Sequence, residues 1–370
     1  MNVICGVCGC QAKFVPNTYR CDCGHAWEPD CLVAFDEKLI DHNRYDVARY
    51  ANLFGSVEFD WAVSLGAGWT PLIHSKWQNT DGLFKLEYVS PTGSFKDRGT
   101  EVEVAYLKSA GVTKIVEDSS GNAGASISAY AAHAGIKAEI YAPASAPQAK
   151  LDQIALFGAE LRAIPGARIE ATRAVMGAVE KGEIYASHAY NPVYLLGQHT
   201  FAWEMWEQTA GNLPDAVIIP VGQGGLFLGA YFGFQHLLTS GVISHLPRLF
   251  AAQPAVFAPI FHPFSAGLEN IAQIDASGKS IADGVAIANP VRGNRILEGI
   301  RETAGGVIKV SEQQIKAAYF SLAEIGLFVE PTSALAAAAI PQVKQYLNKP
   351  DARILAALTG NGLKTPFLVK

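Results

Sequence analysis

The sequence predicts an α/β protein made of open, twisted and mostly parallel sheets flanked by helices. Two observations carry this prediction. Short apolar runs alternate with segments of helical periodicity along most of the chain, and parallel strands need helical crossovers of this kind. Several apolar runs also end in glycine-rich turns that lead into a helix, and the carboxyl ends of strands are where open α/β sheets bind their ligands.

The predicted elements follow in chain order after a linker-like stretch, residues 36–59. Apolar runs of about four to six residues predict strands at 83–88, 114–117, 138–142, 160–164, 184–187, 216–221, 249–252, 307–310 and 353–358. Apolar positions at helical spacing predict helices at 99–110, 123–134, 146–157, 167–181, 195–209, 226–238, 311–325 and 332–347. We find no repeat at the periods typical of solenoids.

The composition excludes some classes of protein. The 370 residues include 29 Lys+Arg and 34 Asp+Glu, a net charge of −5. A nucleic-acid-binding surface needs a basic excess on one face, whereas the basic residues here are spread along the whole chain, so we expect no nucleic-acid partner. Hydrophobic residues make up 49% of the chain, enough for a large core, and the length predicts two domains.

Two uncharged stretches, residues 216–247 and 249–264, need to be checked as membrane spans, and the first is long enough to cross a membrane. A proline and a glycine run cut the first stretch near its start, and three prolines break up the second, so both are expected in the interior of a soluble domain. Residues 1–10 have no basic start and no apolar core before a cleavage site. We therefore expect no secretory signal, no membrane partner and a cytoplasmic location.

All six cysteines lie in the first 31 residues and define a small N-terminal module, residues 1–35. The pairs Cys5-x-x-Cys8 and Cys21-x-Cys23 resemble the two knuckles of a zinc ribbon, which predicts these four thiols as zinc ligands. The second pair is one residue shorter than in a regular ribbon. Further candidate ligands are Cys10, His25 and Cys31. The alternative is a degenerate ribbon that has lost its metal and keeps free thiols.

Three glycine-rich turns follow predicted strands, at residues 90–99, 119–124 and 222–226. Each would place backbone N–H groups and a helix N-terminus at the carboxyl end of a strand, which suits an anion. The alternative for each turn alone is a tight strand-to-helix connection. None matches the P-loop or the dinucleotide fingerprint, so ATP and NAD are disfavoured.

These turns carry a family resemblance. The segments SPTGSFKDRG (90–99), SSGNAG (119–124), GQGGL (222–226) and LTGNGLK (358–364) resemble the cofactor motifs of pyridoxal-phosphate enzymes of the tryptophan-synthase β-subunit fold, also called fold type II. Within that fold they resemble threonine synthases most closely. The resemblance covers nearly the whole chain and implies two open sheets, bound pyridoxal phosphate and a lyase that eliminates or replaces a group at Cβ or Cγ of an amino acid.

The resemblance also implies roles for individual residues. Lys96, after Phe95, would form a Schiff base with the cofactor aldehyde and later move the substrate α-proton. Asn122 would bind the 3′-oxygen of the cofactor ring, with a helix N-cap as the alternative role. Thr359 would face the pyridine nitrogen. The cofactor phosphate would lie on the segment Gly222, Gln223, Gly224, Gly225 and Leu226.

The expected substrate site departs from the family pattern. The positions for the substrate are Ser119, Ser120, Gly121 and Ala123. Threonine synthases act on O-phosphohomoserine, and where they have a threonine and an arginine for its phosphate, this chain has Ala123 and Tyr194. A tyrosine offers one neutral donor in place of a bidentate cation. Side chains that would compensate are His188, Arg168, Arg173 and Lys150.

Three functions follow from this pattern. The first is a threonine synthase with a rearranged phosphate site. The second is a paralogue acting on another amino acid, as an ammonia-lyase, a dehydratase or a β-replacement synthase. The third, a non-catalytic binding protein, is disfavoured by Lys96. The resemblance further implies a large cofactor domain (36–96 and 188–370), a small domain (97–187) that closes over the cofactor, and a homodimer.

Overall fold

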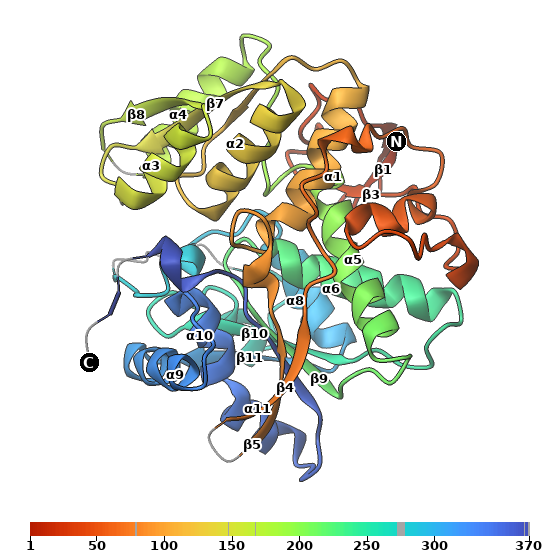
Figure 1. Cartoon of the computed structure of the whole chain (residues 1–370), viewed down its shortest axis with the longest axis vertical. Coiled ribbons are helices and arrows are strands. Elements are labelled where there is room, and N and C mark those ends of the chain that lie inside the picture. Colours follow the sequence, from red (N-terminus) through yellow and green to blue (C-terminus); the bar gives the residue numbers. More distant parts are fainter. Residues whose placement is uncertain (78–79, 147, 167, 272–277, 366, 369–370) are drawn as a thin grey trace. The chain divides into compact units, whose positions relative to one another are not determined.

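The computed structural model describes residues 1–370 except 78–79, 147, 167, 272–277, 366 and 369–370. The chain divides into two compact units, which can be followed by colour in Figure 1. Unit 1 comprises residues 1–69 and 90–200, and unit 2 comprises residues 70–89 and 201–370. The sequence-based domains, with a moving domain at 97–187, stay a prediction, because compactness does not test motion.

Unit 1 contains a three-stranded parallel sheet in the order β6-β7-β8. Its strands are β6 (Lys114–Glu117), β7 (Lys137–Pro143) and β8 (Glu160–Ile164). The helices of this unit are α1 (Lys96–Ser109), α2 (Asn122–Ala134), α3 (Gln148–Leu156) and α4 (Arg168–Val179). α2 packs on β7 and on α3, and α4 packs on all three strands. α5 (Pro192–Gln208) begins in unit 1 and ends in unit 2.

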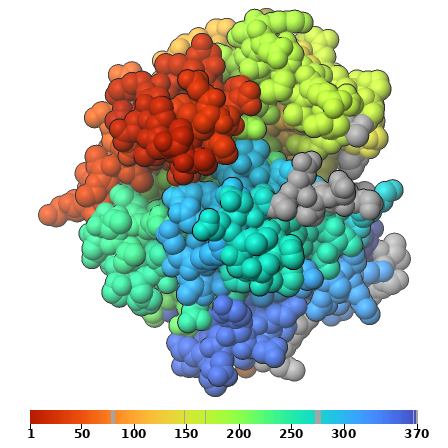
Figure 2. Space-filling view, turned by 180° about the vertical axis from the view of Figure 1, so that it is seen from behind, coloured from red at the N-terminus to blue at the C-terminus, as the bar shows by residue number. Residues whose placement is uncertain are grey.

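The N-terminal part of unit 1 holds a small antiparallel sheet. In it, β1 (Asn2–Cys5) pairs with β2 (Gln11–Lys13) and with β3 (Trp27–Pro29). Tyr19 of this module packs edge-on against Tyr185 and Tyr190, with ring centroids 5.4 and 5.3 Å away, and its hydroxyl donates to Met176 Sδ at 3.5 Å. Figure 2 shows the N-terminal region, in red, as one compact mass at the surface. The module is therefore packed onto the rest of unit 1.

Unit 2 contains a six-stranded sheet in the order β11-β10-β9-β12-β5-β4. Its strands are β4 (Leu72–Trp77), β5 (Thr80–Lys85), β9 (Ala216–Pro220), β10 (Arg248–Pro254), β11 (Gly306–Val310) and β12 (Ile354–Ala357). All neighbours run parallel except β4, which forms an antiparallel hairpin with β5 at one edge. The central strands β9 and β12 are buried throughout, as expected for parallel strands covered on both faces.

Helices cover this sheet on two sides. The helices of unit 2 are α6 (Gly225–Thr239), α7 (Phe261–Ser265), α8 (Gly293–Glu302), α9 (Glu312–Glu324), α10 (Pro331–Ala338) and α11 (Ile340–Leu347). In Figure 1, α9 and α10 lie on one side of the sheet and α6 and α8 on the other. α10 packs on β9, β10 and β12, while α6 packs on β9, β10 and α8. The predicted α/β class with two mostly parallel sheets is confirmed.

Short 3-10 helices complete both units. Those in unit 1 are η1 (Glu37–Leu39), η2 (Val47–Phe54) and η3 (Trp61–Val63). Those in unit 2 are η4 (Glu87–Val89), η5 (Asp283–Val285) and η6 (Gly362–Lys364). Because η2 buries most of its side chains, the prediction of a linker at residues 36–59 is wrong.

Two elements in the structure also differ from those that the sequence predicts. Residues 184–187 form a single parallel bridge, Val116 to Tyr185, instead of a strand, because the chain turns at Ser187, whose carbonyl accepts a hydrogen bond from the amide of Asn191. The predicted helix 332–347 is divided into α10 and α11 around Ala339. Pro341, the second residue of α11, has no N–H to donate to a continuous helix.

The two uncharged stretches lie inside unit 2, as expected. Residues 216–247 include β9, the glycine-rich turn and α6, and the second stretch begins with β10. The side chains of β9 and β10 are buried almost throughout. Across the described residues, no helix combines the length and the apolar character needed to cross a membrane.

A buried ion pair joins β5 to α5 within unit 2. Lys85 Nζ donates to the Glu204 carboxylate, to the Thr70 carbonyl oxygen and, at 2.8 Å, to Gln208 Oε1. The side chains of Lys85 and Glu204 are 0% and 1% exposed. An ammonium group this deep in the interior needs its partner, because water cannot replace it.

We expect Glu204→Ala to destabilise the protein by about 3–5 kcal/mol, since it leaves a buried charge without a counterion. The double variant Lys85→Met/Glu204→Leu removes both charges at similar volume and should regain most of that loss. Urea denaturation of the purified variants measures both effects. A double variant no more stable than Glu204→Ala would contradict this account.

Candidate active site

Lys96 is the first residue of α1, and a buried carboxylate ties its turn to α2. Asp97 accepts hydrogen bonds from the backbone amide of Thr92 at 2.7 Å and from the hydroxyls of Thr92 and Ser126, each at 2.6 Å. Phe95 occupies the N-cap position, and Lys96 Nζ lies 4.7 Å from the centre of the Phe95 ring. The Asp97 network thus fixes the start of α1 against the first turns of α2.

A second predicted turn joins β6 to α2. Gly121 is the N-cap of α2 and Asn122 is its first residue, so the alternative role of Asn122 as an N-cap is wrong. A Cβ on Gly124 would lie 1.9 Å from the carbonyl oxygen of Ser119, and the turn therefore requires glycine at this position. Ser119 Oγ accepts a hydrogen bond from the amide of Gly121 at 3.3 Å. This one turn holds Ser119, Ser120, Gly121, Asn122 and Ala123.

In unit 2 the third turn joins β9 to α6. Gly224 is the N-cap of α6, with a φ of +78° and no capping side chain. The Gln223 side chain is already engaged, because its Oε1 accepts a hydrogen bond from the amide of Val291 at 3.0 Å. The first amides of α6 have no acceptor within the helix. The segment Gly222 to Leu226 therefore presents donors suited to an anion.

Thr359 lies just after β12, the neighbour of β9 in the sheet. Because β9 and β12 are parallel, their carboxyl ends reach the same edge, so Thr359 and the Gly222–Leu226 turn share that edge. The Thr359 hydroxyl is 3.4 Å from Ser333 Oγ. Ser333 Oγ in turn accepts from the amide of Gly360 at 2.7 Å. Ser333 thus holds the Thr359 segment in place, a role that the sequence alone did not indicate.

Comparison with known proteins identifies the family. Residues 63–360 match the family model of pyridoxal-phosphate dependent enzymes. The chain belongs to this family. It is 31% identical to a threonine synthase of Methanocaldococcus jannaschii, over 98% of this chain and 92% of the relative. It is 34% identical to a threonine synthase of a Bacillus species, over 86% of this chain and 89% of the relative.

Solved structures give the same result for the fold. A crystal structure of a threonine deaminase from T.th. superposes with a TM-score of 0.69 at 25% identity, covering 81% of this chain and 94% of the other. The expected resemblance to threonine synthases, the fold class and the assignment as a pyridoxal-phosphate-dependent lyase are confirmed.

Each unit of this pyridoxal-phosphate enzyme has residues that suit a different part of the cofactor. In unit 1, Lys96 supplies the primary amine that an aldehyde needs. In unit 2, a Cβ at Gly224 would lie 2.2 Å from Ile296 Cδ1, so the turn keeps bare backbone at the start of α6, an arrangement that suits a phosphate group. Thr359 adds a hydroxyl at the same sheet edge.

His188, one of the candidate compensating side chains, pairs with Glu117, which the sequence did not indicate as a site residue. His188 Nδ1 lies 2.8 Å from Glu117 Oε1, and the two side chains are 11% and 1% exposed. Burial raises the pKa of Glu117 well above its usual value, against the opposing charges of Arg168 and Lys96. Burial, followed by the charge of Lys96, lowers the pKa of His188 well below its usual value. Both shifts favour an uncharged pair.

Tyr194, at the position of the missing arginine, is fully enclosed in unit 1. Its ring packs on Gly99, where a Cβ would lie 2.5 Å from the ring carbons, and its ring centroid is 6.1 Å from that of His188. Burial, followed by the charge of Glu103, raises the pKa of Tyr194 well above its usual value. Tyr194 is therefore a neutral phenol at physiological pH.

The four predicted metal ligands come together in the N-terminal module. The Sγ atoms of Cys5, Cys8, Cys21 and Cys23 all lie within 4.8 Å of one another. The distance is 3.5 Å from Cys5 to Cys23 and 3.6 Å from Cys8 to Cys21. Burial opposes ionisation of Cys5, but hydrogen bonds from the amides of Cys8 and Val7 lower the pKa of its thiol to about 7. Cys10, Cys31 and His25 lie outside this group.

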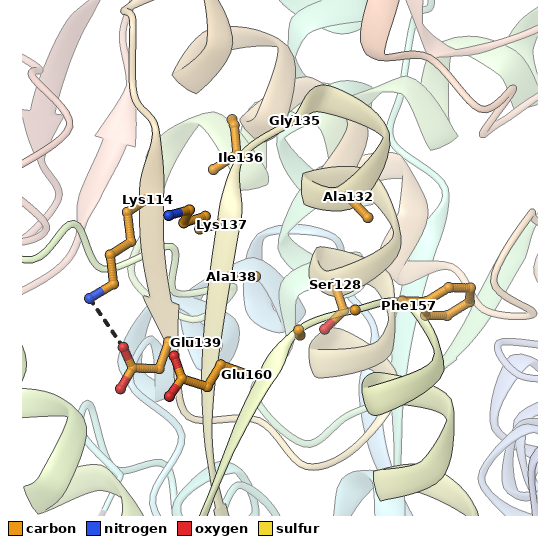
Figure 3. A pocket seen from close by; sticks show the side chains of 12 residues that line it. Lys114, Ser128, Ala132, Gly135, Ile136, Lys137, Ala138, Glu139, Phe157 and Glu160 are labelled. Carbon is orange, nitrogen blue, oxygen red and sulfur yellow. Dashed lines mark ion pairs between the residues drawn. The ribbon is translucent and has the colours of Figure 1, made fainter.

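Unit 1 also has a pocket of about 310 Å³ that is not part of the candidate site. Figure 3 shows Lys114, Lys137 and Glu160 on its wall, with Lys114 paired to Glu139 at 3.1 Å. These residues lie near the amino ends of β6, β7 and β8. The turn at 119–123 follows the carboxyl end of β6, which is where α/β sheets bind their ligands.

Proposed function

We propose that this chain is a pyridoxal-phosphate-dependent lyase that eliminates or replaces a group at Cβ or Cγ of an amino acid, in the manner of threonine synthases. The observation that carries the proposal is Lys96 at the start of α1, held by the buried Asp97 network, in a chain of this family. When bound, the cofactor withdraws electrons from Cα and so weakens its bond to hydrogen.

The residues of this chain have separate tasks in the proposal. Lys96 binds the cofactor covalently and moves the α-proton, and Phe95 and Asn122 hold the ring. The turn from Gly222 to Leu226 binds the phosphate through its amides. Ser119, Ser120, Gly121 and Ala123 border the substrate. Thr359 faces the ring nitrogen with a hydroxyl, which does not stabilise a proton there as a carboxylate would, and this favours elimination and replacement.

Two substrate classes compete. The relatives named threonine synthase favour O-phosphohomoserine. A paralogue acting on another amino acid, as an ammonia-lyase, dehydratase or β-replacement synthase, is favoured by one observation: the buried, neutral Tyr194 where an arginine would pair with phosphate.

The experiment is reconstitution with pyridoxal phosphate followed by a substrate panel. Phosphohomoserine, homoserine, serine and threonine are offered in turn, and phosphate, ammonia and amino-acid products are measured. A visible absorbance band and conversion of at least one substrate are expected. A reconstituted protein that stays colourless would refute the proposal.

We further propose that the four-cysteine cluster binds zinc. In a tetrahedral site with Zn–S bonds of about 2.3 Å the sulfurs are roughly 3.8 Å apart, close to the distances of 3.5 and 3.6 Å found here. Elemental analysis should find about one zinc per chain, and a chelator should lower the thermal stability. Less than about a tenth of an equivalent, with folding unaffected by chelator, would support a degenerate ribbon instead.

Three broader expectations also remain proposals. The chain forms a homodimer, which light scattering of the purified protein can measure. Residues 97–187 move as a small domain during the reaction, which would appear as ligand-dependent hydrogen exchange. The enzyme works in the cytoplasm, where cell fractionation should find it.

A further inference from the structure

A buried polar cluster lies at the carboxyl end of β6 in unit 1. We call Glu117, His188, Tyr194, Glu103 and Asn191 the β6 cluster. Glu117 is the last residue of β6, two positions before Ser119. The bridge from Val116 to Tyr185 lays the segment leading to His188 along the same strand. Asn191 Nδ2 donates to Glu103 Oε1 at 2.6 Å. The cluster therefore adjoins the turn proposed to border the substrate.

The raised pKa of Glu117 and the lowered pKa of His188 both favour a pair in which Glu117 keeps its proton and neither side chain is charged. With Glu117 protonated, its Oε1–H donates to the bare Nδ1 of His188, and the ring keeps Nε2–H as a donor. Burial also raises the pKa of Glu103 to about 8. Near neutral pH the cluster therefore offers neutral donors and acceptors in place of charges.

Two atoms of the cluster have unused hydrogen-bonding capacity. Glu117 Oε2 is buried without a hydrogen-bond partner in the described structure. The buried Tyr194 hydroxyl has the Gln198 side chain beside it but makes no close hydrogen bond. Tyr194 is 1% exposed and Glu117 is 1% exposed. Buried polar atoms normally have hydrogen-bond partners. A ligand group that donates to Glu117 Oε2 and accepts from the Tyr194 hydroxyl would therefore complete the cluster.

The charges around the pair do not suit a phosphate group. Near Glu117 lie the negative charge of Asp118, Glu103 when it ionises, and the positive charges of Arg168 and Lys96. Lys96 is committed to the cofactor in the proposed function. Arg168 is exposed at the start of α4. A buried phosphate dianion without a closely paired cation is strongly disfavoured.

Resting on the proposed function, we propose that Glu117, His188 and Tyr194 select a substrate with an uncharged hydroxyl on Cβ and reject a phosphate ester. The substrate class is a β-hydroxy α-amino acid, such as serine or threonine. Glu117 Oε2 accepts the hydroxyl hydrogen, and Tyr194 donates to the hydroxyl oxygen. These are positioning residues that set specificity, while Lys96 carries the proton transfer.

The reaction balances without a further reactant. Elimination breaks the Cα–H and Cβ–O bonds, and Lys96 takes up the Cα proton. The hydroxyl leaves as water with one proton, which the Lys96 ammonium replaces, so the amine returns to its starting state. The enamine product then consumes one water and releases ammonia and a 2-oxo acid. No oxidant or reductant is needed.

The first test compares L-serine with O-phospho-L-serine, and L-threonine with O-phospho-L-homoserine, on the reconstituted enzyme. We expect kcat/KM for at least one hydroxy amino acid to exceed that of both phosphate esters by about a hundredfold, because an unpaired buried dianion is rejected. Ammonia and 2-oxo acid report one activity, and phosphate reports the other. Equal or faster phosphate release overturns the inference while leaving the proposed function intact.

The second test uses Tyr194→Phe, with Tyr141→Phe as the matched control on β7. Loss of one hydrogen bond to the substrate should raise KM for the hydroxy amino acid about fivefold to tenfold with little change in kcat. The control should match the parent enzyme, because the Tyr141 hydroxyl donates to Glu139, a residue outside the β6 cluster. An unchanged KM in Tyr194→Phe overturns the inference.

The third test is the pH profile of Glu117→Gln. Because the pKa of Glu117 is raised, the acid is protonated at neutral pH and ionises as the pH rises, so kcat/KM of the parent should fall on the alkaline side. Glutamine resembles the protonated acid, so the variant should keep most activity at neutral pH and lose that alkaline fall. Loss of activity at neutral pH in a folded Glu117→Gln would show an ionised Glu117 and overturn the inference.

The failures of the two proposals can be distinguished. A reconstituted protein without cofactor on Lys96 overturns the proposed function and this inference with it. A protein that holds the cofactor but converts none of the four compounds overturns both as well. Preference for a phosphate ester overturns the specificity alone.

Discussion

Lys96→Ala is expected to abolish covalent cofactor attachment and to lower kcat/KM by about a thousandfold or more, the range typical for loss of an acid–base group. The amine is the proposed point of attachment and the proposed carrier of the α-proton. The measurement is borohydride reduction of the reconstituted protein, followed by mass spectrometry of the peptide that contains residue 96. The cofactor mass should appear on this peptide in the parent and be absent from the variant.

Lys108→Ala provides the control on the same helix. Lys108 is exposed near the end of α1, where its Nζ donates to the carbonyl oxygen of Ala134 at 2.8 Å. This variant should keep the cofactor, the visible band and the activity. If Lys96→Ala still retained the cofactor covalently, the assignment of Lys96 would be wrong, whatever its effect on turnover.

Gly224→Ala is expected to weaken cofactor binding about tenfold or more and to destabilise the protein by roughly 2–4 kcal/mol. Two effects add here. A φ of +78° is unfavourable for alanine, and its Cβ would lie 2.2 Å from Ile296 Cδ1. Either the buried Ile296 side chain or the start of α6 must shift to relieve that contact, and any shift of α6 moves its amides. Fluorescence titration with pyridoxal phosphate and thermal unfolding measure the two losses.

Gly241→Ala separates backbone strain from the steric clash. Gly241 follows α6 with a φ of +74°, and nothing lies within 4 Å of a Cβ there. Its alanine variant should lose only about 1 kcal/mol of stability and bind the cofactor normally. Equal cofactor affinity in both alanine variants would contradict the role of the Gly222–Leu226 turn.

The sequence predicted β6 and β8 with the bounds that the structure has, because each is a short apolar run between clear turn signals. The hairpin of β4 with β5 was missed at its first strand, since Leu72–Trp77 is an exposed edge whose burial pattern is irregular. Residues 184–187 were predicted as a strand but form only a single bridge to β6. Whether such a run forms a strand depends on its tertiary contacts, which cannot be inferred from local apolarity.

Some residues of the candidate site could likewise be predicted from the sequence, and others could not. Glycine-rich turns and Lys96 have local sequence signals, and they could be named before the fold was known. Glu117 had only a weak signal, a Glu-Asp pair at the end of an otherwise apolar strand. Its partner His188 is 71 positions away, so the uncharged pair could be recognised only in three dimensions. The same holds for Ser333 beside Thr359.

The packing of Tyr19 on the rest of unit 1 has a practical consequence for any shortened form of this chain. Deleting residues 1–35 would remove not only the cysteines but also the ring that covers Tyr185 and Tyr190. Those two tyrosines lie on either side of His188 in the sequence, and the parts of their rings that Tyr19 covers would become open to water. A trimmed enzyme should therefore aggregate more readily, and its losses should not be attributed to zinc alone.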